Sequence, residues 1–110
     1  MNFNIQTSVE FEKGLKALSK KYSSIRSDYA TLLEELEENP KSGDPIGKNC
    51  YKVRMAISSK NKGKSGGARI ITHLLARLEG DTLYLLKIYD KSDIDTISNK
   101  ELLVLLKEIQ

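Results

Sequence analysis

The strongest constraint on the fold is the alternation of apolar and polar residues in the second half of the chain. Apolar side chains occupy every second position of residues 51–58, which is the period of a strand with one buried face. After a glycine-rich loop, residues 68–79 form a longer apolar run, and a Gly80-Asp81 turn leads into residues 83–91. These segments predict a three-stranded antiparallel meander.

The first forty residues predict a strand followed by a helical hairpin. Residues 3–7 alternate in polarity, and Thr7 with Glu10 forms a capping-box pattern that begins a helix. Apolar residues then recur at helical spacing over residues 11–22 and again over 25–36, before a proline. The two amphipathic helices pack most simply as a hairpin.

The last segment predicts a closing helix. Ser98 and Glu101 form a second capping box, and residues 102–110 continue the helix. Its apolar residues cover more than one face, so the helix is either nearly fully buried or partly kept for a partner. Residues 39–48 have turn chemistry throughout. The whole chain, residues 1–110, is therefore predicted as one α+β domain with a mainly antiparallel sheet.

Composition narrows the class of protein. With 39% hydrophobic and 30% charged residues, the chain has the composition of a soluble globular domain. No apolar stretch approaches the roughly 18 residues that span a bilayer, and polar residues stand where a signal peptide is apolar, so we expect a cytoplasmic protein. The single Cys50 agrees with a reducing compartment. With one histidine and no Cys/His cluster, we expect no metal and no cofactor.

Positive charge is concentrated in one part of the chain. The net charge is only +3, but residues 45–78 contain eight Lys or Arg and no Asp or Glu. Such a local basic surface favours a polyanionic partner. Strict alternation predicts a sheet face with Lys52, Arg54, Arg69, Lys87, Tyr89 and Lys91, a loop rim with Lys60, Lys62 and Lys64, and an opposite face of the last strand with Tyr84, Leu86 and Ile88.

RNA is the anion that this set of side chains fits best. Lysine and arginine bind phosphates, and a tyrosine stacks on a base or transfers a proton. The same groups serve RNA self-cleavage: a base deprotonates the 2′-hydroxyl, that oxygen attacks the adjacent phosphorus, cations stabilise the phosphorane, and an acid protonates the leaving 5′-oxygen. On composition alone, the favoured interpretation is instead a solvated basic face that only binds nucleic acid or keeps the protein soluble.

Weaker signals point elsewhere. Residues 63–65 resemble part of a P-loop, but Ser58 stands where that motif needs a glycine. His73 is interpreted as a packed core residue, with a general acid as the alternative, because four residues along a strand separate it from Arg69 by about 13 Å. The four glutamates within residues 34–38 form either a solvated face or a site for a basic partner.

Three short motifs, in this order, resemble the RelE/ParE superfamily of bacterial type II toxins, most closely its HigB-like branch. They are NCYKVRM (49–55), KGKSGGARII (62–71) and LLKIYDKSDIDTIS (85–98). With the paired helices, the resemblance extends over nearly the whole chain. It implies a RelE-like microbial RNase fold and an mRNA interferase that cuts mRNA in the A site of the 70S ribosome, inhibits translation, and is held inactive by a cognate antitoxin.

The resemblance also implies roles for individual residues. Catalysis and phosphate binding fall on Arg54, Arg69, Tyr89 and Lys91, and the RNA-binding rim consists of Lys52, Lys60, Lys62 and Lys64, with Lys87 on the same predicted face. Tyr89 is preferred to His73 as general acid. Two alternatives remain open: a ParE-type gyrase poison with the same fold, and a non-catalytic RNA-binding member.

Overall fold

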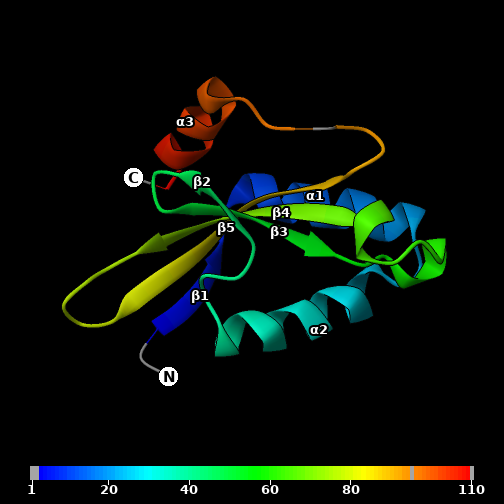
Figure 1. The fold of residues 1–110 in the computed structure, drawn as a ribbon, viewed down its shortest axis with the longest axis horizontal. Helices are drawn as coiled ribbons and strands as arrows, with labels where there is room; N and C mark the ends of the chain where they lie inside the picture. Colours follow the sequence, from blue (N-terminus) through cyan, green and yellow to red (C-terminus); the bar gives the residue numbers. More distant parts are fainter. Residues whose placement is uncertain (1–2, 95, 110) are drawn as a thin grey trace.

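The computed structural model describes residues 3–94 and 96–109 and confirms the predicted α+β class (Figure 1). One mixed sheet has the strand order β1-β5-β4-β3-β2, in which β1 is parallel to β5 and the other neighbouring pairs are antiparallel. The elements are β1 (Phe3–Thr7), α1 (Val9–Lys21), α2 (Ile25–Glu38), β2 (Asp44–Gly47), β3 (Cys50–Met55), η1 (Ser58–Lys60), η2 (Lys64–Gly66), β4 (Ala68–Leu75), β5 (Asp81–Asp90) and α3 (Asn99–Lys107), where η marks a single 3-10 turn. The predicted strand, helical hairpin, meander and C-terminal helix are all present.

β2 is an edge strand in a segment for which the sequence predicts only turns. Asp44 pairs with Lys52 and Pro45 with Tyr51, and the register shifts between Pro45 and Gly47. A proline and a bulge are typical of edge strands, where one side of the backbone has no strand neighbour. The proline and glycine of this segment, which indicate a turn, are thus also compatible with a short edge strand.

The helix caps follow the predicted patterns with one correction. In α1 the hydroxyl of Ser8 accepts a hydrogen bond from the amide of Phe11 at 3.1 Å, so Ser8, and not Thr7, is the N-cap. In α3 the hydroxyl of Ser98 accepts from the amide of Glu101 at 3.1 Å, as predicted. Each cap satisfies an amide that the first helical turn leaves without a backbone partner.

α1 and α2 cover one face of the sheet and bury the main core (Figure 1). At Gly14, α1 lies so close to β5 that a Cβ atom would be 2.8 Å from the carbonyl oxygen of Ile88, so this glycine sets the distance between helix and strand. The buried residues of this core are Phe11, Leu15, Leu18, Ile25, Leu32, Leu36, Val53, Met55, Ile57, Ala68, Ile70, Leu83, Leu85 and Ile88.

α3 packs on the opposite face over a smaller cluster of Cys50, Ile71, Leu86, Tyr89, Leu102 and Leu105. Leu103 and Val104, on its outer side, are 47% and 53% exposed. The helix is therefore covered on one side only, with an apolar outer side. Gln110, the end of the predicted helix, lies outside the described residues. Among the helices of the described residues, none is long and apolar enough to cross a membrane.

A β-bulge in β5 corrects the predicted faces of that strand. The register with β4 shifts between Ile71 and Thr72, which makes Leu86 an extra residue in β5. Ile88 lies in the main core, whereas Leu86 and Tyr84 pack in the cluster under α3. The prediction that these three β5 residues share one face is wrong, because strict alternation ends at the bulge.

Candidate nucleic-acid interface

Three of the predicted catalytic residues form one row across the sheet. Arg54 of β3 is directly opposite Arg69 of β4, and Arg69 is directly opposite Tyr89 of β5. Directly opposed residues have Cα atoms about 4.5–5.5 Å apart and side chains on the same face. The fold thus brings these residues together on the sheet face away from α1 and α2.

Lys91 lies just beyond β5, two residues after Tyr89, so it follows this row along the strand and is not part of it. Its amide donates a hydrogen bond to the carbonyl oxygen of Gly67 at 3.1 Å, which extends the β4–β5 pairing by one step. A Cβ atom at Gly67 would lie 2.1 Å from the carbonyl oxygen of Met55, so only glycine lets the loop approach β3 so closely. The Lys91 side chain is exposed.

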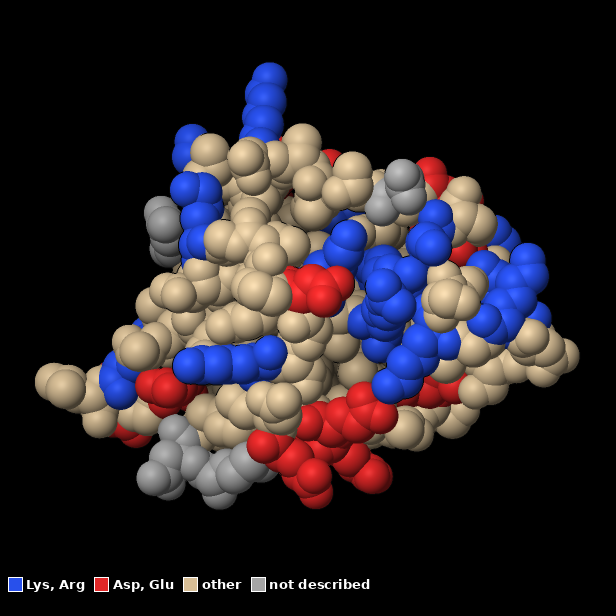
Figure 2. Space-filling view, in the orientation of Figure 1, with Lys and Arg blue, Asp and Glu red and all other residues tan. Residues whose placement is uncertain are grey.

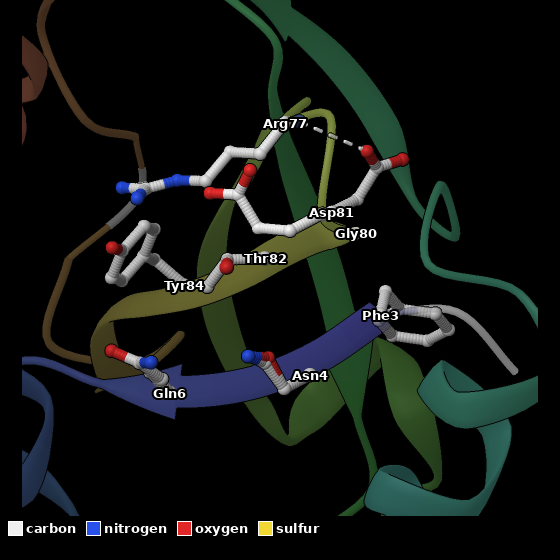
Figure 3. Close-up of a pocket in the computed structure, with 9 residues that line it drawn as sticks. Phe3, Asn4, Gln6, Arg77, Gly80, Asp81, Thr82 and Tyr84 are labelled. Carbon is white, nitrogen blue, oxygen red and sulfur yellow. Dashed lines mark hydrogen bonds between the residues drawn. The ribbon is translucent and has the colours of Figure 1, made fainter.

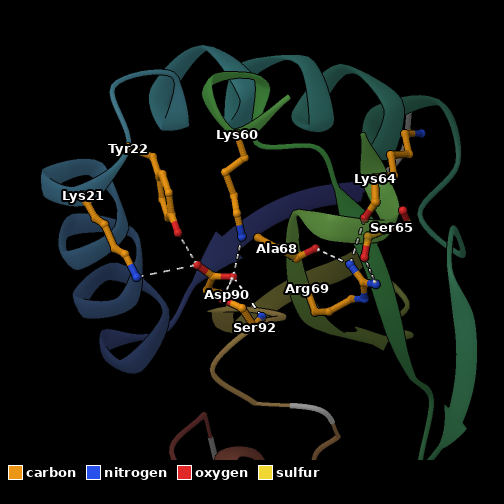
Figure 4. Close-up of polar contacts among 9 residues, drawn as sticks. All are labelled: Lys21, Tyr22, Lys60, Lys64, Ser65, Ala68, Arg69, Asp90 and Ser92. Atoms are coloured by element: carbon orange, nitrogen blue, oxygen red, sulfur yellow. Dashed lines mark hydrogen bonds and ion pairs between the residues drawn. The ribbon is translucent and has the colours of Figure 1, made fainter. Parts of the chain in front are cut away.

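The guanidinium of Arg69 is held by the loop that precedes it (Figure 4). Arg69 is only 4% exposed, and Nη1 donates to the carbonyl oxygens of Lys64 (3.0 Å) and Ala68 (3.1 Å), while Nη2 donates to that of Ser65 (3.2 Å). Burial and then the charge of nearby Arg54 lower the pKa of Arg69, which nevertheless stays charged. Arg69 therefore stabilises the η2 turn in this structure, and its guanidinium group is not directed at solvent.

Tyr89 is likewise covered. It is 4% exposed and packs in the apolar cluster under α3. Arg54, by contrast, is exposed. Of the row, only Arg54 reaches the surface directly.

The next row across the sheet contains Lys52, Ile71 and Lys87. Lys87 forms an ion pair with Glu101 of α3, and its side chain is only 17% exposed. The predicted exposed RNA contact is therefore corrected for Lys87, because the closing helix covers it. Lys52 is half-buried and lines an open hollow beside β3.

The three loop lysines lie in different environments. Lys60 places Nζ 2.9 Å from the Oδ1 atom of Asp90, and its side chain is 12% exposed, so it is not the exposed rim residue that the sequence predicts. Lys62 is exposed. Lys64 is also exposed and lies 3.9 Å from the carboxylate of Glu35.

The candidate cations that remain accessible at this end of the sheet are Lys52, Arg54, Lys62, Lys64 and Lys91, and we call them the basic patch. In Figure 2, basic side chains gather over the end of β3 and the loop of residues 58–67, which we call the glycine loop, and acidic side chains line the border where α2 runs.

Two hollows beside β3, of about 250 and 150 Å³, are both lined by Arg54, Lys64 and Glu35. The acidic end of α2 therefore borders the basic patch directly. The sequence does not predict this neighbour, because the segment between Pro45 and Leu78 contains no acid and the acidic residues come from an earlier helix.

His73 lies apart from the basic patch. It is opposite Cys50 and Tyr84, two rows from Arg69, and Nδ1 is 3.5 Å from the Sγ atom of Cys50. Burial raises the pKa of the Cys50 thiol to about 11. The structure does not bring His73 to the predicted catalytic row, and its side chain is half-buried and is not fully buried in the core.

A further hollow, of about 310 Å³, lies at the other end of β5 (Figure 3). Its lining is mainly polar and includes Asn4, Gln6, Arg77, Thr82 and Tyr84. No residue of the predicted site lines it. The sequence contains no signal for it, since polar residues alternating along β1 are equally expected on any solvent-facing strand.

Among residues 3–94 and 96–109, no three His, Cys, Asp or Glu side chains are grouped as a metal site requires. No model of a known protein family matches the chain. Membership of the RelE/ParE superfamily therefore stays a prediction that rests on the three motifs.

Proposed function

We propose that this chain is a ribosome-dependent mRNA endoribonuclease, the toxin of a type II toxin–antitoxin pair. The supporting observation is the row of Arg54, Arg69 and Tyr89, with the basic patch around it. Cations beside a tyrosine fit the phosphates and bases of single-stranded RNA. The resemblance of the three motifs to RelE/ParE toxins implies that cleavage takes place in the ribosomal A site.

The proposed reaction needs only protein and RNA groups. A base takes the proton of the 2′-hydroxyl, the 2′-oxygen forms a bond to the adjacent phosphorus, the bond from phosphorus to the 5′-oxygen breaks, and the 5′-oxygen takes a proton from the general acid. The products are a 2′,3′-cyclic phosphate and a 5′-hydroxyl. Arg54 and Lys91, both exposed, bind the phosphate and stabilise the phosphorane, and Tyr89 supplies the proton.

The proposal includes a movement, because Arg69 and Tyr89 are covered in this structure. The η2 turn has to release Arg69 before phosphate oxygens replace the carbonyl oxygens of Lys64 and Ser65 as acceptors. Hydrogen bonds from a guanidinium to a phosphate are charge-assisted and stronger than those to a neutral carbonyl. Bound RNA therefore favours the released form.

The proposed inhibitor is an antitoxin segment with acidic residues and an apolar helical face. Leu103 and Val104 offer an exposed apolar surface on α3, and the basic patch offers the complementary charge. Copurification with the product of the adjacent gene tests this partner. Failure of the two purified proteins to bind would contradict it.

A non-catalytic RNA-binding protein is the second candidate. It is favoured by one observation: the exposed patch is purely cationic, while the arginine and the tyrosine that chemistry requires, Arg69 and Tyr89, are each 4% exposed. In that case RNA binds and stays intact.

Expression in a bacterial host, followed by primer extension on several messages, separates these functions. The endoribonuclease predicts new message ends at codons within translated regions. Growth arrest without new ends would contradict it, and gyrase-linked DNA breaks with a DNA-damage response would point to the gyrase poison instead. RNA binding without new ends would support the second candidate.

A further inference from the structure

The carboxylate of Asp90 joins several segments of the chain that are distant in sequence (Figure 4). Its side chain is 0% exposed. Oδ2 accepts a hydrogen bond from the hydroxyl of Tyr22 at 2.6 Å and lies 3.9 Å from Nζ of Lys21. Oδ1 accepts from Nζ of Lys60 at 2.9 Å, and from the amide and hydroxyl of Ser92 at 3.0 and 2.7 Å. We call these five residues the Asp90 cluster.

The position of Asp90 in β5 connects this cluster to the proposed site. Asp90 stands between Tyr89 and Lys91, and successive side chains of a strand point to opposite faces. Tyr89 accordingly packs under α3, whereas the Asp90 carboxylate meets the end of α1. Fixing Asp90 therefore fixes the backbone that carries both neighbours.

Lys60 connects the same cluster to the glycine loop. The start of this loop is already anchored to α2, because the amide of Ser58 donates to Asp28 at 2.9 Å and the amide of Ser59 donates to the hydroxyl of Ser24 at 2.9 Å. Lys60 adds an anchor at the last residue of η1. The η2 turn and the exposed loop lysines follow directly.

We infer that the Asp90 cluster is a positioning element for the RNA site, which holds the glycine loop and the end of β5 in a fixed relation. This inference rests on the proposed function. Lys60 then acts through Asp90 and does not contact phosphate. The ion pair between Lys60 and Asp90 joins two parts of the proposed site. One part is the end of β5 with Tyr89 and Lys91, and the other is the loop that holds Arg69.

The test compares Lys60→Met with Lys62→Met, a neighbouring exposed lysine of the same loop. Two measurements are made on each protein: amide hydrogen exchange of residues 58–67 without RNA, and affinity for a single-stranded RNA oligonucleotide across a series of salt concentrations. Each phosphate contact that is lost lowers the slope of log affinity against log salt by about 0.7 for single strands. Lys60→Arg keeps the charge and the hydrogen bond and serves as the rescue variant.

For Lys60→Met we expect loop exchange about tenfold faster, RNA affinity roughly fivefold weaker, and an unchanged salt slope. Lys62→Met should leave exchange unchanged and lower the slope by about 0.7. Lys60→Arg should restore both exchange and affinity.

Two results would overturn the inference. One is a salt slope that falls for Lys60→Met as it does for Lys62→Met, because Lys60 would then be a phosphate contact. The other is faster exchange with unchanged RNA affinity, because the cluster would then be only structural.

If the unsubstituted protein binds no RNA, the proposed function fails, while the exchange measurement still decides whether Lys60 holds the loop. Tyr22→Phe, which removes only the 2.6 Å hydrogen bond, repeats the exchange test if Lys60→Met does not fold.

Discussion

At the scale of single residues, Arg54 and Arg69 are opposite each other in the sheet but differ in their surroundings. The side chain of Arg54 is exposed, whereas the guanidinium of Arg69 donates to three carbonyl oxygens, two in the η2 turn and one at Ala68, the first residue of β4. An exposed arginine contributes little to folding, and a buried one with three acceptors contributes more. Substitution of Arg54 should therefore change mainly RNA binding, and substitution of Arg69 should also change the free energy of unfolding.

Arg54→Ala should weaken RNA binding about tenfold, the size expected for one charge-assisted contact. Its free energy of unfolding should change by less than about 0.5 kcal/mol, because the side chain is exposed. Arg77→Ala, an exposed arginine at the other end of the sheet, is the matched control and should affect neither property. Filter binding and urea unfolding of both variants provide the measurements. Equal RNA affinity for the two variants would exclude Arg54 from the interface.

Asp90→Asn should destabilise the fold in a manner that depends on pH. Burial alone would raise the pKa of Asp90, but hydrogen bonds from Tyr22, Ser92 and Lys60 hold it below its ordinary value. The ionised carboxylate thus stabilises the folded state above the unfolded pKa of roughly 3.9, and this contribution is lost as pH falls towards the folded pKa.

Removing one partner of a buried ion pair costs about 3 kcal/mol. We therefore expect Asp90→Asn to lose this amount at pH 7 and clearly less at pH 3, measured by urea unfolding at both values. A loss that is the same at both pH values would show that the negative charge of Asp90 is not what stabilises the fold.

At the scale of secondary-structure elements, α3 lies over the sheet face that carries the predicted site and pairs Glu101 with Lys87. Glu101→Gln removes the negative charge and leaves Lys87 available to phosphate. We expect tighter RNA binding, with a salt slope steeper by up to about 0.7, the value for one added phosphate contact on single-stranded RNA. The control is Glu108→Gln, an exposed glutamate just after the same helix. If both variants behave alike, the effect is one of net charge and Lys87 is not released.

The elements also show which parts of this fold the sequence predicts. Helical periodicity and capping boxes place the helix ends to within about three residues, because both signals are local; the largest difference is at α3, which ends at Lys107. The β5 bulge leaves no such trace: Leu86 is apolar like its neighbours, and only the pairing with β4 reveals it as an extra residue. β2 is missed for a related reason, since its proline and glycine indicate turns equally well.

The sequence predicts where the residues of the candidate site lie in the sheet, but it does not predict which of their side chains are exposed. Alternation correctly places Arg54, Arg69 and Tyr89 on one face. The sequence does not show that Lys60 and Lys87 meet carboxylates from distant segments. Such pairs depend on tertiary contacts that a local charge count cannot detect, because the acidic partners lie 14 to 30 positions away in the chain.

At the scale of the whole molecule, a basic patch and an acidic border lie side by side on one face (Figure 2). The glutamates of α2 repel phosphates, while the lysines and arginines beside them attract phosphates. This arrangement favours an RNA path that follows the loop and the end of β5 and avoids α2. If the proposed function holds, RNA bound on this path is cut by attack of its own 2′-hydroxyl.

The most direct test of that claim uses purified 70S ribosomes that hold a defined mRNA with an empty A site. The protein is added, the new message ends are mapped, and the 5′ ends are labelled by polynucleotide kinase with and without prior phosphatase treatment. We predict cuts in the A-site codon, only on ribosome-bound message, with 5′-hydroxyl ends that label without phosphatase. Intact message with bound protein, or ends that need phosphatase before labelling, would contradict the account.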